Sequence, residues 1–200
     1  MLLRFFIGLV GEHSKFSIHE RILNMTLFVS TLFTILLAIQ GWIEGLNMIL
    51  TIIVSLLASI FAVLYFFAWV RRKNRIVTPI FIAIGLLSVS GLYFLSDGID
   101  GDVPPYFVFT SIITVSLVRR RYYVYLIALN AFAFIACYMI ELNAPQIIQN
   151  YASSDLRDRQ VLYAIMALTI FAGAAFALFK NNYDGERRIV KKQNLDLQRY

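Results

Sequence analysis

Long apolar stretches separated by short charged clusters dominate the chain. Five of them hold the roughly 20 mostly apolar residues that a helix needs to cross about 30 Å of hydrocarbon. They are Ile22–Trp42, Asn47–Val70, Ile76–Leu95, Tyr122–Ile140 and Val161–Phe179. A sixth stretch, Tyr106–Val118, has 13 residues and reaches about 20 Å as a helix. We expect it either to span by recruiting flanking residues or thinning the bilayer, or to form a re-entrant or buried half-helix.

The basic residues predict how these stretches cross the membrane. Of the 18 Lys and Arg residues, 16 lie before the first stretch, after the second, after the fourth and after the last. The other two, Arg157 and Arg159, lie between the fifth and the sixth. Since Lys and Arg concentrate on the cytoplasmic side of bilayers, this distribution predicts six spans with both termini in the cytoplasm. A re-entrant fourth stretch would place the two basic loops on opposite sides.

The composition agrees with an integral membrane protein. The chain of 200 residues is 60% hydrophobic and 15% charged, whereas a soluble domain carries about 25% charged residues. The net charge of +6 comes from the basic loops, so we expect no nucleic-acid partner. The predicted fold class is an all-α bundle of six transmembrane helices in the inner (plasma) membrane, with the lipid bilayer as its surroundings.

Residues 1–21 are predicted to form a cytoplasmic amphipathic segment ahead of the six-helix domain, 22–179. Apolar residues with helical spacing would lie in the membrane interface: Leu2, Phe5, Phe6 and Leu9. Ser17 and Glu20 have the spacing of a capping box, in which each side chain satisfies a backbone N–H at the start of a helix. The first membrane helix is therefore expected to begin near Ser17.

The segment Ser96–Pro105, called the acidic loop below, is the first candidate for external recognition. It places three carboxylates, Asp97, Asp100 and Asp102, among two glycines and two prolines. Three carboxylates in six residues are oxygen ligands of the kind that Ca²⁺ prefers, although the EF-hand spacing is absent. The alternative is that acidic residues and turn formers simply occupy the outer surface. Whether a metal binds stays open at this stage.

Few polar side chains lie inside the predicted spans. Glu141, at the outer edge of the fifth span, is the only charged one, which argues against an ion-coupled transporter because proton and ion pathways use buried charges. Asn130 lies near mid-span and needs a hydrogen-bond partner on another helix, or else contacts a ligand.

Two further features belong to the outer boundary. The loop Leu142–Gln160 is predicted either to pack over the bundle as a lid or to be a connector whose end caps the sixth helix, with Ser153, Ser154 and Asp155 as capping candidates. Aromatic residues near this boundary are expected to form an interfacial belt or, alternatively, the wall of an apolar pocket: Trp42, Tyr93, Phe94, Tyr106 and Tyr138.

The C-terminal residues 180–200 are predicted to begin a cytoplasmic coiled-coil signalling helix. Four residues recur every seven positions from the sixth span onward, as the a positions of a coiled coil do: Phe176, Tyr183, Val190 and Leu197. The matching d positions are half polar, so the alternative is a solvated basic tail. A coiled coil here, with the small residues Gly173 and Ala177 in the sixth span, predicts a homodimer.

Two stretches resemble parts of known receptors. Gly91–Gly101 resembles the aromatic, glycine and aspartate stretch between two spans of multi-span bacterial sensors, and Ile189–Leu197 resembles the helix that leads into their output domains. With the predicted topology, the chain resembles the six-helix membrane sensor region of a receptor histidine kinase or a related cyclase. The resemblance implies a signalling module within a longer receptor. It carries over no catalytic residue and no cofactor, because the chain has no phosphoacceptor or nucleotide-binding block.

The sequence therefore predicts a sensor and dimerisation module. A stimulus outside or within the membrane would be recognised by Asp97, Asp100, Asp102 and Asn130 and relayed through the sixth helix. The alternative is a small six-helix transporter or channel for a neutral solute, and a purely structural membrane anchor comes third. No catalytic constellation is visible in these 200 residues.

Overall fold

The computed structural model describes residues 16–45, 47–118, 120–151, 153–166, 168–170 and 172–173. Over these residues the chain is helical, with no strand, which confirms the predicted all-α class. The long helices are α2 (Ile18–Glu44), α3 (Met48–Trp69), α4 (Asn74–Leu95), α5 (Pro104–Leu117) and α6 (Tyr123–Asn143). Short 3-10 turns join them, namely η1 (Gly98–Asp100), η2 (Arg120–Tyr122) and η3 (Pro145–Ile147).

A further helical segment, called the last helix below, covers residues 154–166 and is also helical at 168–170 and 172–173. The predicted transmission positions Phe176, Tyr183, Val190 and Leu197 lie outside the described residues. The predicted amphipathic helix at the N-terminus lies outside them as well.

Local sequence signals set the first helix boundaries. The Ser17 amide donates to Glu20 Oε2 (2.8 Å) and the Glu20 amide to Ser17 Oγ (3.4 Å), so the predicted capping box is confirmed and α2 begins at Ile18. Gly45 ends α2 in the left-handed conformation, with φ of 63°. The side chain of Asn47 then accepts from the Ile49 amide (2.9 Å) and starts α3.

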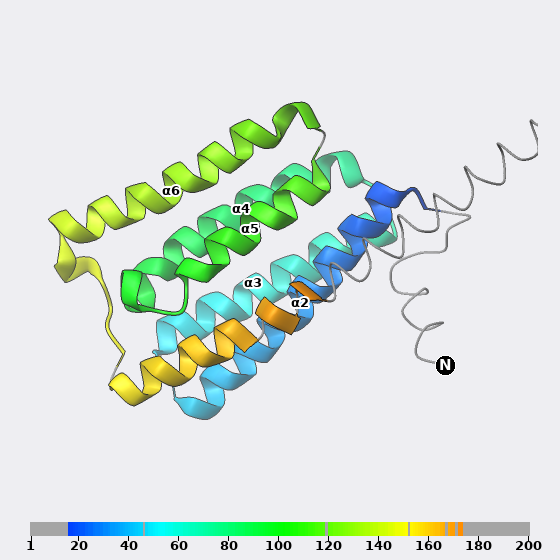
Figure 1. Cartoon of the computed structure of the whole chain (residues 1–200). Coiled ribbons are helices and arrows are strands. Elements are labelled where there is room, and N and C mark those ends of the chain that lie inside the picture. Colours follow the sequence, from blue (N-terminus) through cyan, green and yellow to red (C-terminus); the bar gives the residue numbers. More distant parts are fainter. Residues whose placement is uncertain are drawn as a thin grey trace, which may run out of the picture.

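Consecutive helices run in opposite directions through one bundle (Figure 1). One core cluster joins the start of α2, the end of α3 and the start of α4: Leu23, Leu27, Phe61, Leu64, Ala68, Val77 and Phe81. A second cluster, Ala38, Leu50 and Val54, joins the end of α2 to the start of α3. One end of the bundle, called the acidic end below, contains the acidic loop and residues 144–151, and the opposite end, called the basic end, contains Arg71–Arg75 and Arg120–Arg121 (Figure 1).

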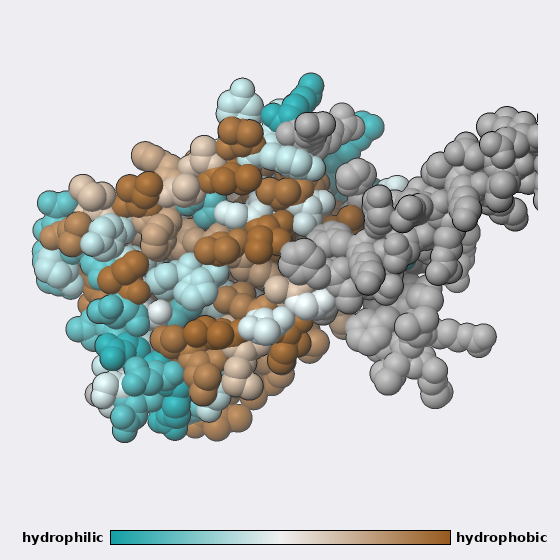
Figure 2. All heavy atoms as spheres, in the orientation of Figure 1, coloured by the Kyte–Doolittle hydropathy of each residue, from teal (hydrophilic) through white to brown (hydrophobic). Residues whose placement is uncertain are grey.

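The surface of the bundle is that of a membrane protein. Four helices, α2, α3, α4 and α6, are long and apolar enough to cross a bilayer, and α5 is a shorter apolar helix. Most apolar side chains of α6 are exposed, among them Val124, Phe132 and Ile135. Figure 2 shows hydrophobic atoms along the flanks of the helices and hydrophilic atoms gathered toward both ends of the bundle. These apolar faces require lipid around them.

The short stretch around Tyr106–Val118 forms α5, a helix of 14 residues that starts with Pro104 and Pro105. It lies beside α4 and α6 (Figure 1). Phe107 and Thr114 are its buried residues. Proline is tolerated in the first helical turn because the N–H it lacks would have no intrahelical partner there.

Candidate functional site

The acidic loop folds back tightly on the end of α4. Asp97 and Gly98 both adopt the left-handed conformation, with φ of 65° and 60°. At Gly101 an added Cβ would lie 1.6 Å from the carbonyl oxygen of Ser96. Only glycine allows that approach, so the two glycines of the loop are required by its backbone path.

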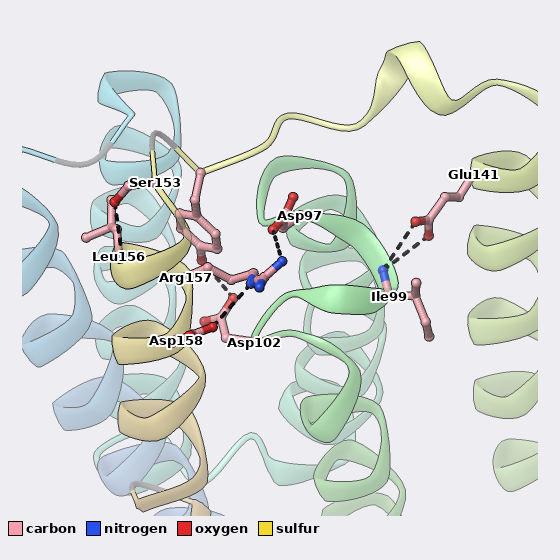
Figure 3. Close-up of polar contacts among 9 residues, drawn as sticks. Asp97, Ile99, Asp102, Glu141, Ser153, Leu156, Arg157 and Asp158 are labelled. Atoms are coloured by element: carbon pink, nitrogen blue, oxygen red, sulfur yellow. Dashed lines mark hydrogen bonds and ion pairs between the residues drawn. The ribbon is translucent and has the colours of Figure 1, made fainter.

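Glu141 attaches the acidic loop to α6. Its carboxylate accepts a hydrogen bond from the hydroxyl of Tyr93. It also accepts one from the backbone amide of Ile99, whose nitrogen lies 3.2 Å from Oε2 (Figure 3). A Cβ on Gly98 would lie 2.7 Å from Glu141 Oε1. Hydrogen bonds to a charged acceptor are among the stronger ones in proteins. The one charged residue inside the predicted spans thus joins α4, the loop and α6.

The three aspartates of the loop have different environments. Asp97 forms an ion pair with Arg157 (3.7 Å between Oδ2 and Nη1), and Arg157 also contacts Asp158 (3.4 Å) (Figure 3). Asp102 accepts a hydrogen bond from the hydroxyl of Tyr151 (2.9 Å). Asp100 is exposed. The described residues contain no group of three or more His, Cys, Asp or Glu side chains that could hold a metal ion.

Burial changes the proton affinity of the Asp102–Tyr151 pair. Removal from water raises the pKa of the Asp102 carboxyl above its ordinary value, and the hydrogen bond from Tyr151 offsets this only in part. Burial and the neighbouring Asp102 charge likewise raise the pKa of the Tyr151 hydroxyl. Tyr151 therefore stays a hydrogen-bond donor, and the state of the pair depends on Asp102.

The segment between α6 and the last helix lies across the acidic end. The backbone amide of Gln149 donates to the carbonyl of Phe94 (2.8 Å), and the amide of Asp97 donates to the carbonyl of Gln149 (3.1 Å). The Asn47 side chain donates to Gln149 Oε1 (2.7 Å). Ser153 then caps the last helix by accepting from the Leu156 amide (3.2 Å). The segment therefore packs over the end of the bundle, as the lid hypothesis predicted, and its end caps the last helix, as the connector hypothesis predicted.

The last helix packs along α2. Gln160, which is buried, receives a hydrogen bond from Gln40 (3.3 Å) and donates one to Glu44 (2.6 Å). Figure 1 shows this helix, in yellow and orange, beside α2 and α3. The polar side chains of Gln40 and Gln160 meet across 120 positions of sequence, which no local pattern indicates.

Asn130 lies apart from the acidic loop. It is 4% exposed, and its side-chain amide donates to the carbonyl of Phe107 (3.1 Å) across the α5–α6 contact. This is the interhelical partner that a mid-span asparagine requires.

Tyr93 was expected in an interfacial aromatic belt, and that prediction is wrong. Its side chain is completely buried and makes edge contacts with Phe94, Phe107 and Phe134, with ring centroids 5.5, 6.4 and 6.3 Å away. The reason is its hydroxyl, which donates to the carboxylate of Glu141 inside the bundle. Trp42, in contrast, is 61% exposed, as a belt residue would be.

An apolar cavity of about 120 Å³ lies between α2, α3, α4 and α5, lined by Phe33, Leu57, Phe81 and Leu92 among others. Tyr106 also lines it, and its buried hydroxyl has no hydrogen-bond partner among the described residues. Pockets for drug-sized ligands have volumes of about 300–1,000 Å³. This cavity therefore suits only a small, mainly apolar molecule or water.

No protein-family model, curated protein or solved structure matches this chain. At the acidic end, Glu141 joins the acidic loop to α6, Arg157 joins it to the last helix, and Tyr151 joins it to the segment before that helix.

Proposed function

We propose that this protein is the membrane sensor and dimerisation module of a signal-transducing receptor, of the kind that precedes a histidine kinase or cyclase output domain. It would have six spans, including α5 and the last helix, and both termini in the cytoplasm. The separation of 16 basic residues from two others supports this orientation. The last helix would carry the signal into a coiled coil formed by residues 180–200 of two copies.

One observation carries the proposal. The candidate recognition loop contacts the helix that leads toward the C-terminus through the Arg157–Asp97 ion pair, and it contacts the segment just before that helix through the Tyr151–Asp102 hydrogen bond. Anything that binds or reshapes the acidic loop therefore acts directly on the start of this helix.

These two contacts, called the two ties below, have free energies small enough for a stimulus to shift the protein between two conformations. The side chains of Arg157 and Asp97 are 36% and 15% exposed, and a partly exposed ion pair contributes at most about 1 kcal/mol. The Tyr151–Asp102 hydrogen bond contributes about 0.5–1.5 kcal/mol. Together they amount to about 0.5–2.5 kcal/mol, which changes the ratio of two conformations roughly 2–70-fold. A stimulus shifts such an equilibrium by its difference in affinity for the two states.

Cysteine cross-linking in native membranes tests the proposal. Val190→Cys and Leu197→Cys should each form disulfides between two copies, because both occupy the a position of the predicted coiled coil. Arg157→Gln and Tyr151→Phe should each change the cross-linking yield several-fold. The matched control is Arg159→Gln, which removes a positive charge from the same helix without breaking either tie, and should leave the yield unchanged.

The native Cys137 stays in place, because it is buried and out of reach of a second copy. Efficient cross-links that respond to Arg157→Gln but not to Arg159→Gln would support a sensor. Absence of cross-links at both tail positions, or yields that do not respond to either broken tie, would contradict it.

A further inference from the structure

An open groove lies between α4 and α6 in the half of the bundle near the basic end. Its volume is about 620 Å³. On the α4 side it is lined by Pro79, Ala83 and Leu86, and on the α6 side by Leu126 and Leu129. The end of α5 forms its floor through Leu117 and Val118.

The groove exists because α6 packs against α4 at the other end. The contacts between these two helices are Tyr93 with Phe134 (6.3 Å between ring centroids), Tyr93 with Glu141, and Cys137 Sγ with the Ser90 carbonyl (3.9 Å). All of them lie in the acidic half. In the basic half α6 exposes its apolar side chains, and Val124 and Tyr125 are each 74% exposed.

A basic side chain lies at one end of this groove, close in sequence to three others. Arg75 lines it and is exposed, and no ion pair or hydrogen bond of its side chain occurs among the described residues. Arg71, Arg72 and Lys73 directly precede the same helix. Glu20 is the one carboxylate of the described chain at this end, and it is held by Ser17 and Asn74. Among the described residues, the groove therefore combines apolar walls with an end at which basic side chains outnumber the one carboxylate, Glu20, which interacts with Arg72.

We propose that this groove binds one anionic phospholipid, with an acyl chain against Ala83 and Leu126 and the phosphate group at Arg75. From Arg75 to Leu86 the groove follows 11 residues of α4, which is about 17 Å at 1.5 Å per residue. That length corresponds to one leaflet, half of the roughly 30 Å of hydrocarbon. Basic pockets between membrane helices are the sites where anionic headgroups bind.

The inference does not depend on the proposed sensor function. It follows from the membrane character of the helices, the volume of the groove and the charge at its mouth. A zwitterionic lipid would fill the apolar part, but its quaternary amine would offset the attraction between its phosphate and Arg75. A second copy of the chain bound in the groove would need a negatively charged group of its own to pair with Arg75.

Native mass spectrometry of the full chain tests the proposal with phosphatidylglycerol and phosphatidylcholine of identical acyl chains. We expect one phosphatidylglycerol to bind more tightly than phosphatidylcholine. Arg75→Gln should weaken phosphatidylglycerol binding about fivefold, the effect of one basic residue near an anionic lipid. Ala83→Trp, which fills the groove from an exposed position, should weaken binding of both lipids.

The control Arg159→Gln removes one positive charge at the acidic end and should leave lipid binding unchanged. Equal binding of the two lipids would overturn the proposal, as would equal losses in Arg75→Gln and Arg159→Gln. It would also be overturned if Ala83→Trp left phosphatidylglycerol binding intact, or if that variant converted a dimer into a monomer, which would make the groove a contact between copies.

Discussion

Replacing Gly98 by alanine measures how firmly the acidic loop is held to α6. Gly98 has φ of 60°, and an alanine Cβ would lie 2.7 Å from Glu141 Oε1. The left-handed backbone costs a non-glycine residue about 1–2 kcal/mol. The overlap also displaces the carboxylate from the Ile99 amide or the Tyr93 hydroxyl, and one hydrogen bond to a charged group contributes about 1.5–3 kcal/mol. Gly98→Ala should therefore lower the free energy of unfolding by about 2.5–5 kcal/mol.

Two other glycines separate these contributions. Gly45 has φ of 63° with nothing within 4 Å of an added Cβ, so Gly45→Ala should cost only the backbone part, about 1–2 kcal/mol. Gly91 lies inside α4 with free space around it, and Gly91→Ala should be neutral or stabilising by up to about 1 kcal/mol. Denaturant unfolding of the full chain in detergent, followed by far-ultraviolet circular dichroism, compares the three variants.

A double-mutant cycle completes the test. In a Glu141→Ala background the extra cost of Gly98→Ala over Gly45→Ala should disappear, because the colliding carboxylate is gone. Equal costs of Gly98→Ala and Gly45→Ala in the otherwise unchanged protein would refute the reasoning. So would an extra cost that survives the loss of Glu141.

Two further predictions concern polar groups. Asn130→Leu removes the donor to the Phe107 carbonyl and should lower the free energy of unfolding by about 1 kcal/mol; Asn143→Leu, which loses a bond only within its own helix, should change it by less than about 0.5 kcal/mol. Burial raises the pKa of Asp102, so the folded protein keeps this proton to higher pH than the unfolded chain, whose carboxyl titrates near pH 4. The stability contributed by this group should therefore fall as pH rises from about 4 through the folded-state pKa. Thermal unfolding across that range should show the fall in the unmodified protein and not in Asp102→Asn, and parallel profiles would contradict it.

The helices could be predicted because their signals are local. An apolar stretch of about 20 residues meets the hydrocarbon whatever it packs against, so α3 begins and ends within a residue of the predicted Asn47–Val70. The helix α2 begins at Ile18, four residues before the apolar stretch that starts at Ile22, as the capping box predicted. The capping box at Ser17 and Glu20 marked that start, because it satisfies the backbone donors that precede the apolar stretch.

The partners within the site could not be predicted, because they lie far apart in the sequence. Asp102 and Tyr151 are 49 positions apart, and neither hydropathy nor spacing relates two loops that meet only after folding. The belt prediction for Tyr93 was wrong for a similar reason: position along a helix gives depth in the membrane but not the direction of a side chain. The one available signal was Glu141, since a lone carboxylate at the edge of a span needs donors nearby.

The two ends of the bundle differ in how strongly they restrain α6, and this difference connects the two proposals. Near the acidic end α6 is held through Glu141 and Cys137, and a little further along through Asn130. Beyond Leu129 toward the basic end it borders the open groove and exposes most of its apolar surface. Segments with few buried contacts open at lower free energy than well-packed ones. A shift at the acidic loop would therefore act on α6 close to its fixed end, and the displacement would be largest at the basic end, where the proposed lipid fills the gap between α6 and α4.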